Sequence, residues 1–261
     1  MKIDPDVCTG CGSCMVYCPV EAIVETDRKT PKRKAIRAVD LDRCVECGNC
    51  LRAEVCPVDA IVQQPLDWPR SLRSAFSNPM TEHKSKDMGR GTEEMKTNEI
   101  TRRIGKGEVG VAIELGRPLL GSSFRDVERV TRAMAGVGVT FEPHNPLTSL
   151  IEDLSTGTLR KDVLDERVLS TIVEFMIPEE KLDDVLPAIR DVAGRIESVF
   201  SLGIIAVLPP GGQPPVLERI KNLGFDVRPN GKVNLGLGRP IPGDSLPGPD
   251  KQSRGSERRP S

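Results

Sequence analysis

The stretch CTGCGSCMVYCP at residues 8–19 places four cysteines at gaps of two, two and three residues and ends in proline. A second stretch, CVECGNCLRAEVCP at 44–57, repeats the first three cysteines and the Cys-Pro ending, but its last gap holds five residues. The two stretches continue alike, as CPVEAIV at 18–24 and CPVDAIV at 56–62. The first 63 residues therefore hold an internal duplication.

Short elements of secondary structure are predicted around these runs. Each Cys-Pro pair is followed by an acidic residue, and proline at the first helical position with an acid in the first turn is typical of a helix start. We therefore predict short helices at 19–23 and 57–61. Between the two runs, AIRAVDL at 35–41 alternates and predicts a short strand.

Composition and charge exclude several classes of function. All eight cysteines lie between positions 8 and 56, and the N-terminus lacks the apolar core of an export signal. We therefore expect a cytoplasmic protein with reduced thiols rather than disulfides. The formal charge of −1 and 3% aromatic content argue against nucleic acid, and no run of about eighteen apolar residues predicts a membrane span.

The spacing of the cysteines indicates a particular metal chemistry. The pattern C-x2-C-x2-C-x3-C-P of the first run, which the second run repeats with a longer last gap, is typical of cubane iron–sulfur clusters. Gly10, Gly12 and Gly48 avoid side chains beside a cluster and free backbone N–H groups for its sulfur atoms. The alternative is two zinc sites of four thiolates, but zinc requires neither the third cysteine at a two-residue gap nor the proline.

On these motifs, residues 1–63 resemble the bacterial ferredoxins that carry two [4Fe–4S] clusters. In that family the fourth cysteine of each run ligates the cluster of the other run. The resemblance therefore implies two ligand sets, namely Cys8, Cys11, Cys14 and Cys56 for one cluster and Cys44, Cys47, Cys50 and Cys18 for the other. The spacer from Leu51 to Val55 is two residues longer than the family's usual three. Because Cys56 belongs to the other cluster, the longer gap still leaves four thiolates for each.

A linker and a second domain are predicted to follow. Residues 64–107 are polar, contain Pro, Ser and Gly, and lack a sustained apolar period, which predicts a linker. Its candidate anchors on another domain or a partner are Leu66, Trp68, Leu72 and Phe76. The last residues, 241–261, are rich in Pro, Gly and Ser and are expected to form a disordered tail.

Residues 108–240 are predicted to form an α+β domain. Alternating strands at 108–115 and 137–141 flank a helix that Ser123 can cap. The strand at 170–178, a helix interrupted near Pro187 and a further strand complete the order βαββαβ, and a helix and two strands extend it. This order resembles that of ACT-like regulatory domains, which share the ferredoxin-like fold.

The other candidate sites lack the residue patterns of a catalytic or phosphate-binding site. The two histidines, His83 and His144, lie in polar segments and offer no nucleophile–base arrangement. PPGGQPP at 209–215 lacks the spacing of a phosphate-binding loop, which favours a turn. The basic run KRKAIR at 32–37 is favoured as a solvated face, with docking of an acidic redox partner as the alternative. We therefore predict no independent catalysis.

The sequence as a whole predicts electron transfer. The two clusters would serve a ferredoxin-type subunit of an anaerobic oxidoreductase complex, whose partner is a catalytic subunit or another redox protein. The alternative is a redox or metabolite sensor, in which the ACT-like domain binds a small ligand. Pairing of two copies through the ACT-like domain is a further expectation.

Overall fold

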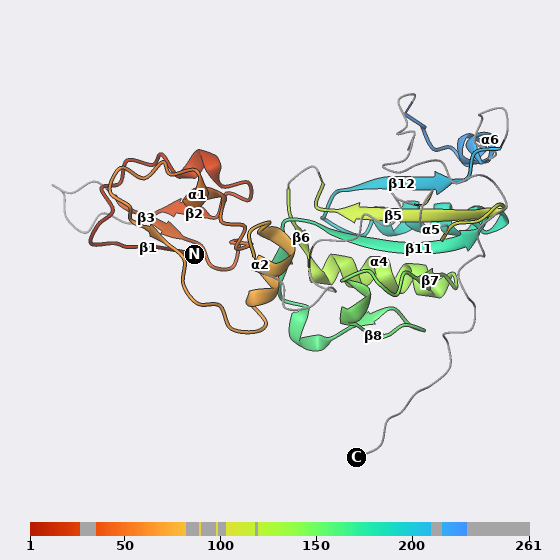
Figure 1. Cartoon of the computed structure of the whole chain (residues 1–261), viewed down its shortest axis with the longest axis horizontal. Helices are drawn as coiled ribbons and strands as arrows, with labels where there is room; N and C mark the ends of the chain where they lie inside the picture. The colour runs from red at the N-terminus through yellow and green to blue at the C-terminus, as the bar shows by residue number, and fades with distance from the viewer. Residues whose placement is uncertain are drawn as a thin grey trace, which may run out of the picture.

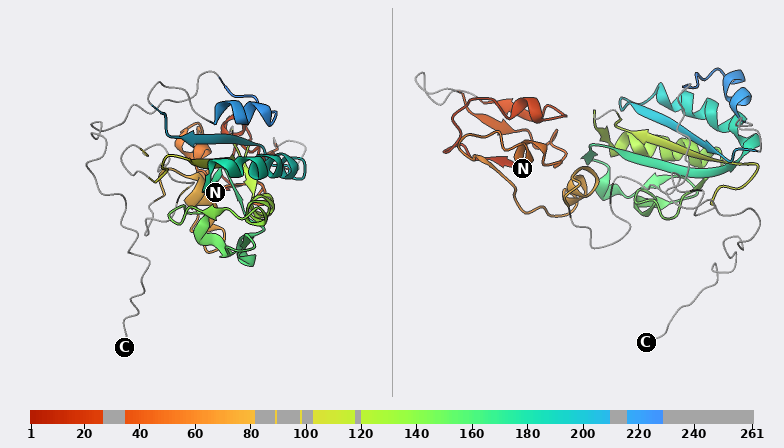
Figure 2. Two further views of the ribbon diagram at one scale, coloured as in Figure 1. Left: turned by 90° about the vertical axis from the view of Figure 1, so that its right-hand side faces the viewer. Right: turned by 45° about the horizontal axis from the view of Figure 1, so that its top comes forward.

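The computed structural model describes residues 1–26, 35–81, 89, 98, 103–117, 120–209 and 216–228. Predictions for His83, for residues 210–215, for the final strand and for the tail lie outside these ranges. Within them, residues 1–63 (the N-terminal part) and the residues from 103 onward (the C-terminal part) lie at opposite ends of the long axis, with helix α2 between them (Figures 1 and 2).

The N-terminal part consists of two small antiparallel sheets joined by cysteine-bearing loops. Strand β1 (Lys2–Ile3) pairs with β4 (Ile61–Val62), and β2 (Ile23–Glu25) pairs with β3 (Arg37–Val39). The strand predicted at 35–41 is thus present as β3. A 3-10 turn, η1 (Met15–Tyr17), follows the third cysteine of the first run, and the four-residue helix α1 (Asn49–Arg52) carries the third cysteine of the second.

The short helices predicted after the two Cys-Pro pairs are wrong. Both segments form a turn and then enter β2 and β4 directly. Glu21 and Asp59 lie in the left-handed region, with φ of 50° and 51°, and a residue in that conformation cannot continue a right-handed helix. Only four residues separate each cysteine from the following strand, so the chain reverses instead of coiling.

The C-terminal part is built on a four-stranded antiparallel sheet in the order β12-β5-β11-β7. Its strands and its two long helices follow one another in the order βαββαβ, as β5 (Glu108–Leu115), α4 (Phe124–Gly136), β7 (Thr140–Phe141), β11 (Thr171–Pro178), α5 (Leu182–Ala193) and β12 (Phe200–Ala206). The apolar faces of both helices share one buried cluster with alternate residues of β5, including Val111 and Ile113. Both helices therefore cover the same face of the sheet.

Short elements occur in the segments of the C-terminal part for which no helix or strand was predicted. They form two further small sheets, of β6 (Ser122–Ser123) with β10 (Arg167–Val168) and of β8 (Ile151–Asp153) with β9 (Thr158–Leu159). Single 3-10 turns are η3 (Thr148–Leu150), η4 (Lys161–Val163) and η5 (Glu179–Lys181). Ser123 caps α4 as predicted, because its side chain accepts a hydrogen bond from the N–H of Asp126.

Two predictions for the C-terminal part need correction. Helix α5 runs through Pro187 without a break, since apolar side chains on both sides, such as Leu186 and Ile189, are buried in the core and hold it together. The predicted helix near 217 is present as α6 (Leu217–Asn222), but residues 225–228 do not form the strand predicted after it.

Helix α2 (Ser71–Ser77) lies inside the stretch for which the sequence predicted a linker. Its Leu72, Ala75 and Phe76 are buried in the core of the C-terminal part, and the Phe76 ring meets Phe124 of α4 edge-on with centroids 5.9 Å apart. Of the four predicted anchors, Leu72 and Phe76 therefore lie in this core. Trp68 is 43% exposed but also contacts the C-terminal part, because its Nε1 donates to Oδ2 of Asp162 over 2.6 Å. No helix in the described ranges is long and apolar enough to cross a membrane.

Candidate metal centres

The eight cysteines gather around two cavities in the N-terminal part. One is called the first cavity, and its cysteines are Cys8, Cys11, Cys14 and Cys56. The other is called the second cavity, and its cysteines are Cys18, Cys44, Cys47 and Cys50. These are the two sets that the resemblance implied, each drawing three cysteines from one run and one from the other. Their role as ligands stays a prediction.

Glycines let the two loops curve closely around their cavities. Gly12 in the first loop and Gly48 in the second have φ of 81° and 72°, which side chains rarely adopt. A β-carbon on Gly48 would lie 2.6 Å from Nη1 of Arg52. The equivalent atom on Gly12 would lie 3.3 Å from Nη2 of Arg37, at the edge of the first cavity.

Backbone N–H groups point at the fourth cysteine of each run. The N–H of Ala22 donates to Sγ of Cys18 over 3.1 Å, and the N–H of Ala60 donates to Sγ of Cys56 over 3.2 Å. A donor directed at sulfur stabilises the thiolate, which is the form that binds metal. The two halves of the duplication therefore repeat this contact as well as the cysteine spacing.

The buried thiols resist ionisation unless a cation is present. Burial raises the pKa of Cys14, Cys44 and Cys47, and it raises the pKa of Cys50 to about 12 with help from the neighbouring thiols of the second cavity. Cys11 is exposed, and hydrogen bonds from Ser13 lower the pKa of its thiol. A coordinated metal ion deprotonates thiols outright, so four thiols around one cavity suit a cationic iron core.

The shape of the two sites fits a cluster. A structural zinc ion needs four ligand atoms about 2.1–2.3 Å from one point. Across the ranges that the structure describes, no three His, Cys, Asp or Glu side chains are arranged to hold a single ion. The thiols instead surround cavities, and Nε of Arg37 beside the first cavity has no hydrogen-bond partner among the described residues. This N–H is available to a sulfur atom of a cluster.

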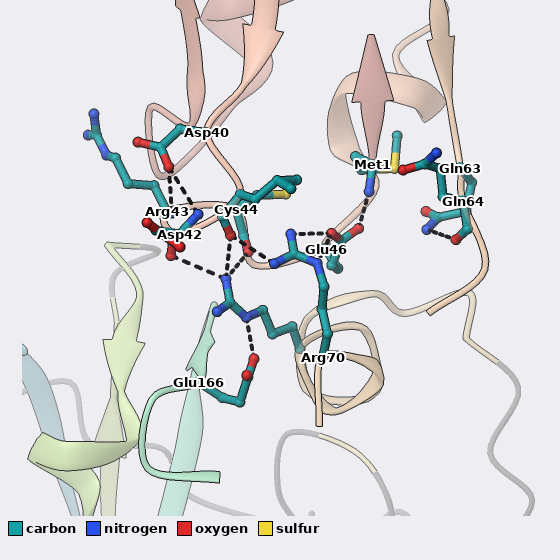
Figure 3. Close-up of polar contacts among 12 residues, drawn as sticks. Met1, Asp40, Asp42, Arg43, Cys44, Glu46, Gln63, Gln64, Arg70 and Glu166 are labelled. Carbon is teal, nitrogen blue, oxygen red and sulfur yellow. Dashed lines mark hydrogen bonds and ion pairs between the residues drawn. The ribbon is translucent and has the colours of Figure 1, made fainter. Parts of the chain in front are cut away.

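A charged group adjoins the second cavity, and sequence reasoning missed it. Glu46, between Cys44 and Cys47, is completely buried and is paired with the Met1 amine and with Arg70 of the turn that leads into α2 (Figure 3). Burial raises the pKa of this carboxyl, but hydrogen bonds from both cations outweigh burial and hold the pKa below its usual value. No pattern in the polar stretch around Arg70 pointed to Glu46.

Comparison with known proteins matches the cysteine-bearing part of the chain to a family. Residues 7–65 match the 4Fe-4S dicluster domain. A stretch of 62 residues is 37% identical to an iron-sulfur subunit of the CoB–CoM heterodisulfide reductase of Methanocaldococcus jannaschii, covering 20% of this chain and 9% of that protein. Ferredoxin-1 of Rhodobacter capsulatus is 45% identical over 47 residues, covering 18% of this chain and 62% of that protein.

The ferredoxin-like protein in the vnf region of Azotobacter vinelandii is matched over nearly its whole length. It is 40% identical over 67 residues, which are 26% of this chain and 95% of that protein. The chain thus spans 62% of Ferredoxin-1 but only 9% of the reductase subunit. No solved structure shows significant similarity to the chain. Through its cysteine-bearing N-terminal part, the chain belongs to the 4Fe-4S dicluster ferredoxins.

Proposed function

We propose that the chain is the electron-transfer subunit of a larger oxidoreductase complex, with one [4Fe–4S] cluster in each cavity. The observation that carries this proposal is the pair of cavities, each lined by four cysteines. Bound clusters would each take up and release one electron. The similarity to an iron-sulfur subunit of heterodisulfide reductase supports the existence of a catalytic partner.

The chain positions the two cavities for transfer between them. Turn η1 lies between Cys14 of the first cavity and Cys18 of the second, and α1, which carries Cys50, lies against η1. The three-residue turn η1 therefore connects a cysteine of the first cavity to a cysteine of the second. This arrangement supports electron passage from one cavity to the other within the N-terminal part.

The first cavity offers the more accessible edge to a partner. Cys11 is exposed, and the apolar side chain of Val58, which lines the same cavity, is 37% exposed. The loop of the second cavity is bordered instead by Arg70, which holds Glu46. We infer that the redox partner docks at the edge formed by Cys11 and Val58.

The C-terminal part is proposed to serve docking or assembly. Its βαββαβ order and its four-stranded sheet support an ACT-like domain over 108–240, reached from the N-terminal part through 64–107. Such a domain could also pair two copies of the chain. The alternative function, a redox or metabolite sensor, is favoured by Arg73 of α2, which links Glu166 of the C-terminal part to the carbonyl oxygens of the Leu41–Cys44 loop.

Metal content tests the cluster proposal directly. Anaerobically reconstituted protein should hold about eight iron and eight acid-labile sulfide ions, as two cubane clusters require. Tightly bound zinc without sulfide would refute it.

Purification from the native host separates the two candidate functions. The proposed subunit should bring down a catalytic protein, and Val58→Lys should lower the yield of that protein while Leu154→Lys, at an exposed site on the C-terminal part, should not. Recovery as a homodimer alone, with a melting temperature that rises on adding an amino acid, would support the sensor instead.

A further inference from the structure

One buried arginine of α2 joins the two parts of the molecule. Arg73 is 5% exposed, and its Nη1 donates to the carbonyl oxygens of Leu41, Asp42 and Cys44 at 2.8, 3.2 and 2.7 Å. On its other side, Nε pairs with the carboxylate of Glu166. Figure 3 shows Glu166 of the C-terminal part facing Cys44 and Asp42 of the N-terminal part across this contact.

The environment of Arg73 makes its charge effective at short range. A guanidinium that is withdrawn from water must be balanced by a counter-ion and by hydrogen bonds, which Glu166 and the three carbonyl groups supply. Glu166 itself is 8% exposed. Charges in such surroundings are weakly screened, so both act strongly on groups a few ångströms away.

The contact reaches a cysteine of the second cavity. Cys44 is the first cysteine of that loop, and its carbonyl accepts the shortest of the three hydrogen bonds from Arg73. Three residues earlier, Arg70 holds the same loop through Glu46, at 2.6 Å, and through the carbonyl of Leu41, at 2.8 Å. Two arginines one helical turn apart thus hold the Leu41–Glu46 segment from the same side.

We propose that the Arg73–Glu166 ion pair sets the reduction potential of the cluster held in the second cavity and makes that potential depend on the C-terminal part. Reduction adds a negative charge to a cluster, and nearby charge is one of the factors that set the potential. The Arg73 cation therefore favours the reduced cluster, and the Glu166 anion opposes this effect. Any movement that separates Glu166 from Arg73 would raise the potential.

The effect should be confined to one cluster. The arginine beside the first cavity is Arg37, which pairs with Glu25 within the N-terminal part. All the hydrogen bonds that the structure describes between Arg73 and the N-terminal part go to the loop of the second cavity. A charge change at Glu166 thus reaches the two cavities unequally.

The test is a redox titration of the full-length, reconstituted protein, followed by electron paramagnetic resonance. Glu166→Gln should move one of the two potentials in the positive direction, and Arg73→Gln should move the same potential in the negative direction. Asp165→Asn is the matched control, because this neighbouring carboxylate forms an exposed pair with Arg125 and should shift neither potential. Unchanged potentials in Glu166→Gln, or equal shifts of both clusters, would overturn the proposal.

Two further comparisons keep the outcome decisive. If Arg73→Gln fails to fold, Glu166→Gln decides alone, since it leaves the three carbonyl contacts of Arg73 in place. The double variant should return toward the wild-type potential if charge is the cause, and a double variant that matches Arg73→Gln would overturn that cause. The inference rests on the proposed clusters. Wild-type protein without iron and sulfide would refute both the proposed function and this inference. Intact clusters whose potentials do not shift would refute the inference alone.

Discussion

The backbone N–H of Ala22 lies 3.1 Å from the sulfur of Cys18 and donates a hydrogen bond to it. This contact requires the chain to reverse within the residues after Cys18, and Glu21 makes the reversal with a φ of 50°. The second run repeats the arrangement at Ala60 and Cys56, with Asp59 in the same conformation. The left-handed residue is therefore part of how each fourth cysteine is presented to its cavity.

Replacing Glu21 by glycine should stabilise the protein. A non-glycine residue in the left-handed region costs about 1–2 kcal/mol, whereas glycine carries an entropic cost of about 0.5–1 kcal/mol. The exposed pair of Glu21 with Arg43 contributes little. We expect Glu21→Gly to raise the melting temperature of the reconstituted protein by a few degrees. Glu25→Gly, within strand β2, should lower it, and a lower value for Glu21→Gly would contradict the explanation.

Helix α2 should contribute strongly to stability although it lies in a polar stretch. Leu72 is fully buried in the core of the C-terminal part. Leu72→Ala should lower the free energy of unfolding by about 2–5 kcal/mol, the usual cost of removing a buried leucine side chain. Met80→Ala, at a side chain that is 71% exposed, should change it by less than about 0.5 kcal/mol. Thermal unfolding followed by circular dichroism measures both, and equal effects would contradict the burial.

The two parts of the molecule differ in how far the sequence predicted them. Cysteine spacing is a local pattern, so it predicted which four cysteines meet at each cavity once the family resemblance supplied the exchange of Cys18 and Cys56. The helical period after Ser123 likewise reflects burial on one face, whereas the middle of the strand at 108–115 is buried on both faces. In these places, local and tertiary preferences agree.

No pattern in the sequence predicted the long-range contacts. Helix α2 shows only three apolar positions over seven residues, and its formation depends on a core built from segments that lie later in the chain. Arg73 meets Glu166 across 93 positions of sequence, which no periodicity can indicate. The helices expected after Pro19 and Pro57 failed for the opposite reason, because a contact to sulfur overrides a good local helix start.

Asp126 should make the stability of the C-terminal part depend on pH. Burial raises the pKa of this carboxyl, but hydrogen bonds from Ser198 and Arg129 outweigh burial and hold the pKa below its ordinary value. The folded pKa lies below the unfolded one, so the stabilisation is complete above about pH 4 and is lost as the pH falls through the folded pKa.

The variant Asp126→Asn isolates this dependence. At pH 7 its free energy of unfolding should be about 1–3 kcal/mol lower than that of the wild type, because a charged hydrogen-bond acceptor is lost. The difference between the two proteins should shrink as the pH is lowered from 7 toward 3. Comparing them at each pH cancels acid effects on the clusters. A difference that stays constant over this range would contradict the assignment to the carboxylate.

Gly157 is required by a close approach of two backbones. Its φ is 72°, and a β-carbon there would lie 2.2 Å from the carbonyl oxygen of Thr131 in α4. Gly157→Ala should therefore cost more than about 2 kcal/mol, since both the backbone conformation and the packing must change. Gly136→Ala is the control, because nothing lies within 4 Å of the added atom. Thermal unfolding should separate the two clearly, and similar melting temperatures would contradict this geometry.

The long spacer of the second cysteine run should be dispensable for cluster binding. The first run reaches its fourth cysteine through the three residues of η1, whereas the second uses α1 and a turn in which Glu54 has a φ of 51°. Within this spacer, Arg52 donates to Oδ1 of Asn78 over 2.7 Å, just after α2. The extra residues thus serve a contact with the neighbouring helix, outside both cavities.

Deleting Ala53 and Glu54 leaves three residues between Cys50 and Cys56, as in the first run. The shortened protein should retain about eight iron ions after reconstitution, because each cavity keeps four cysteines. It should lose less than about 1 kcal/mol of stability, since the contact between Arg52 and Asn78 is exposed. Cys56→Ser, measured in parallel, removes a thiol of the first cavity and should lower the iron content. Loss of both clusters in the deletion variant would show that the spacer sets the geometry of the sites.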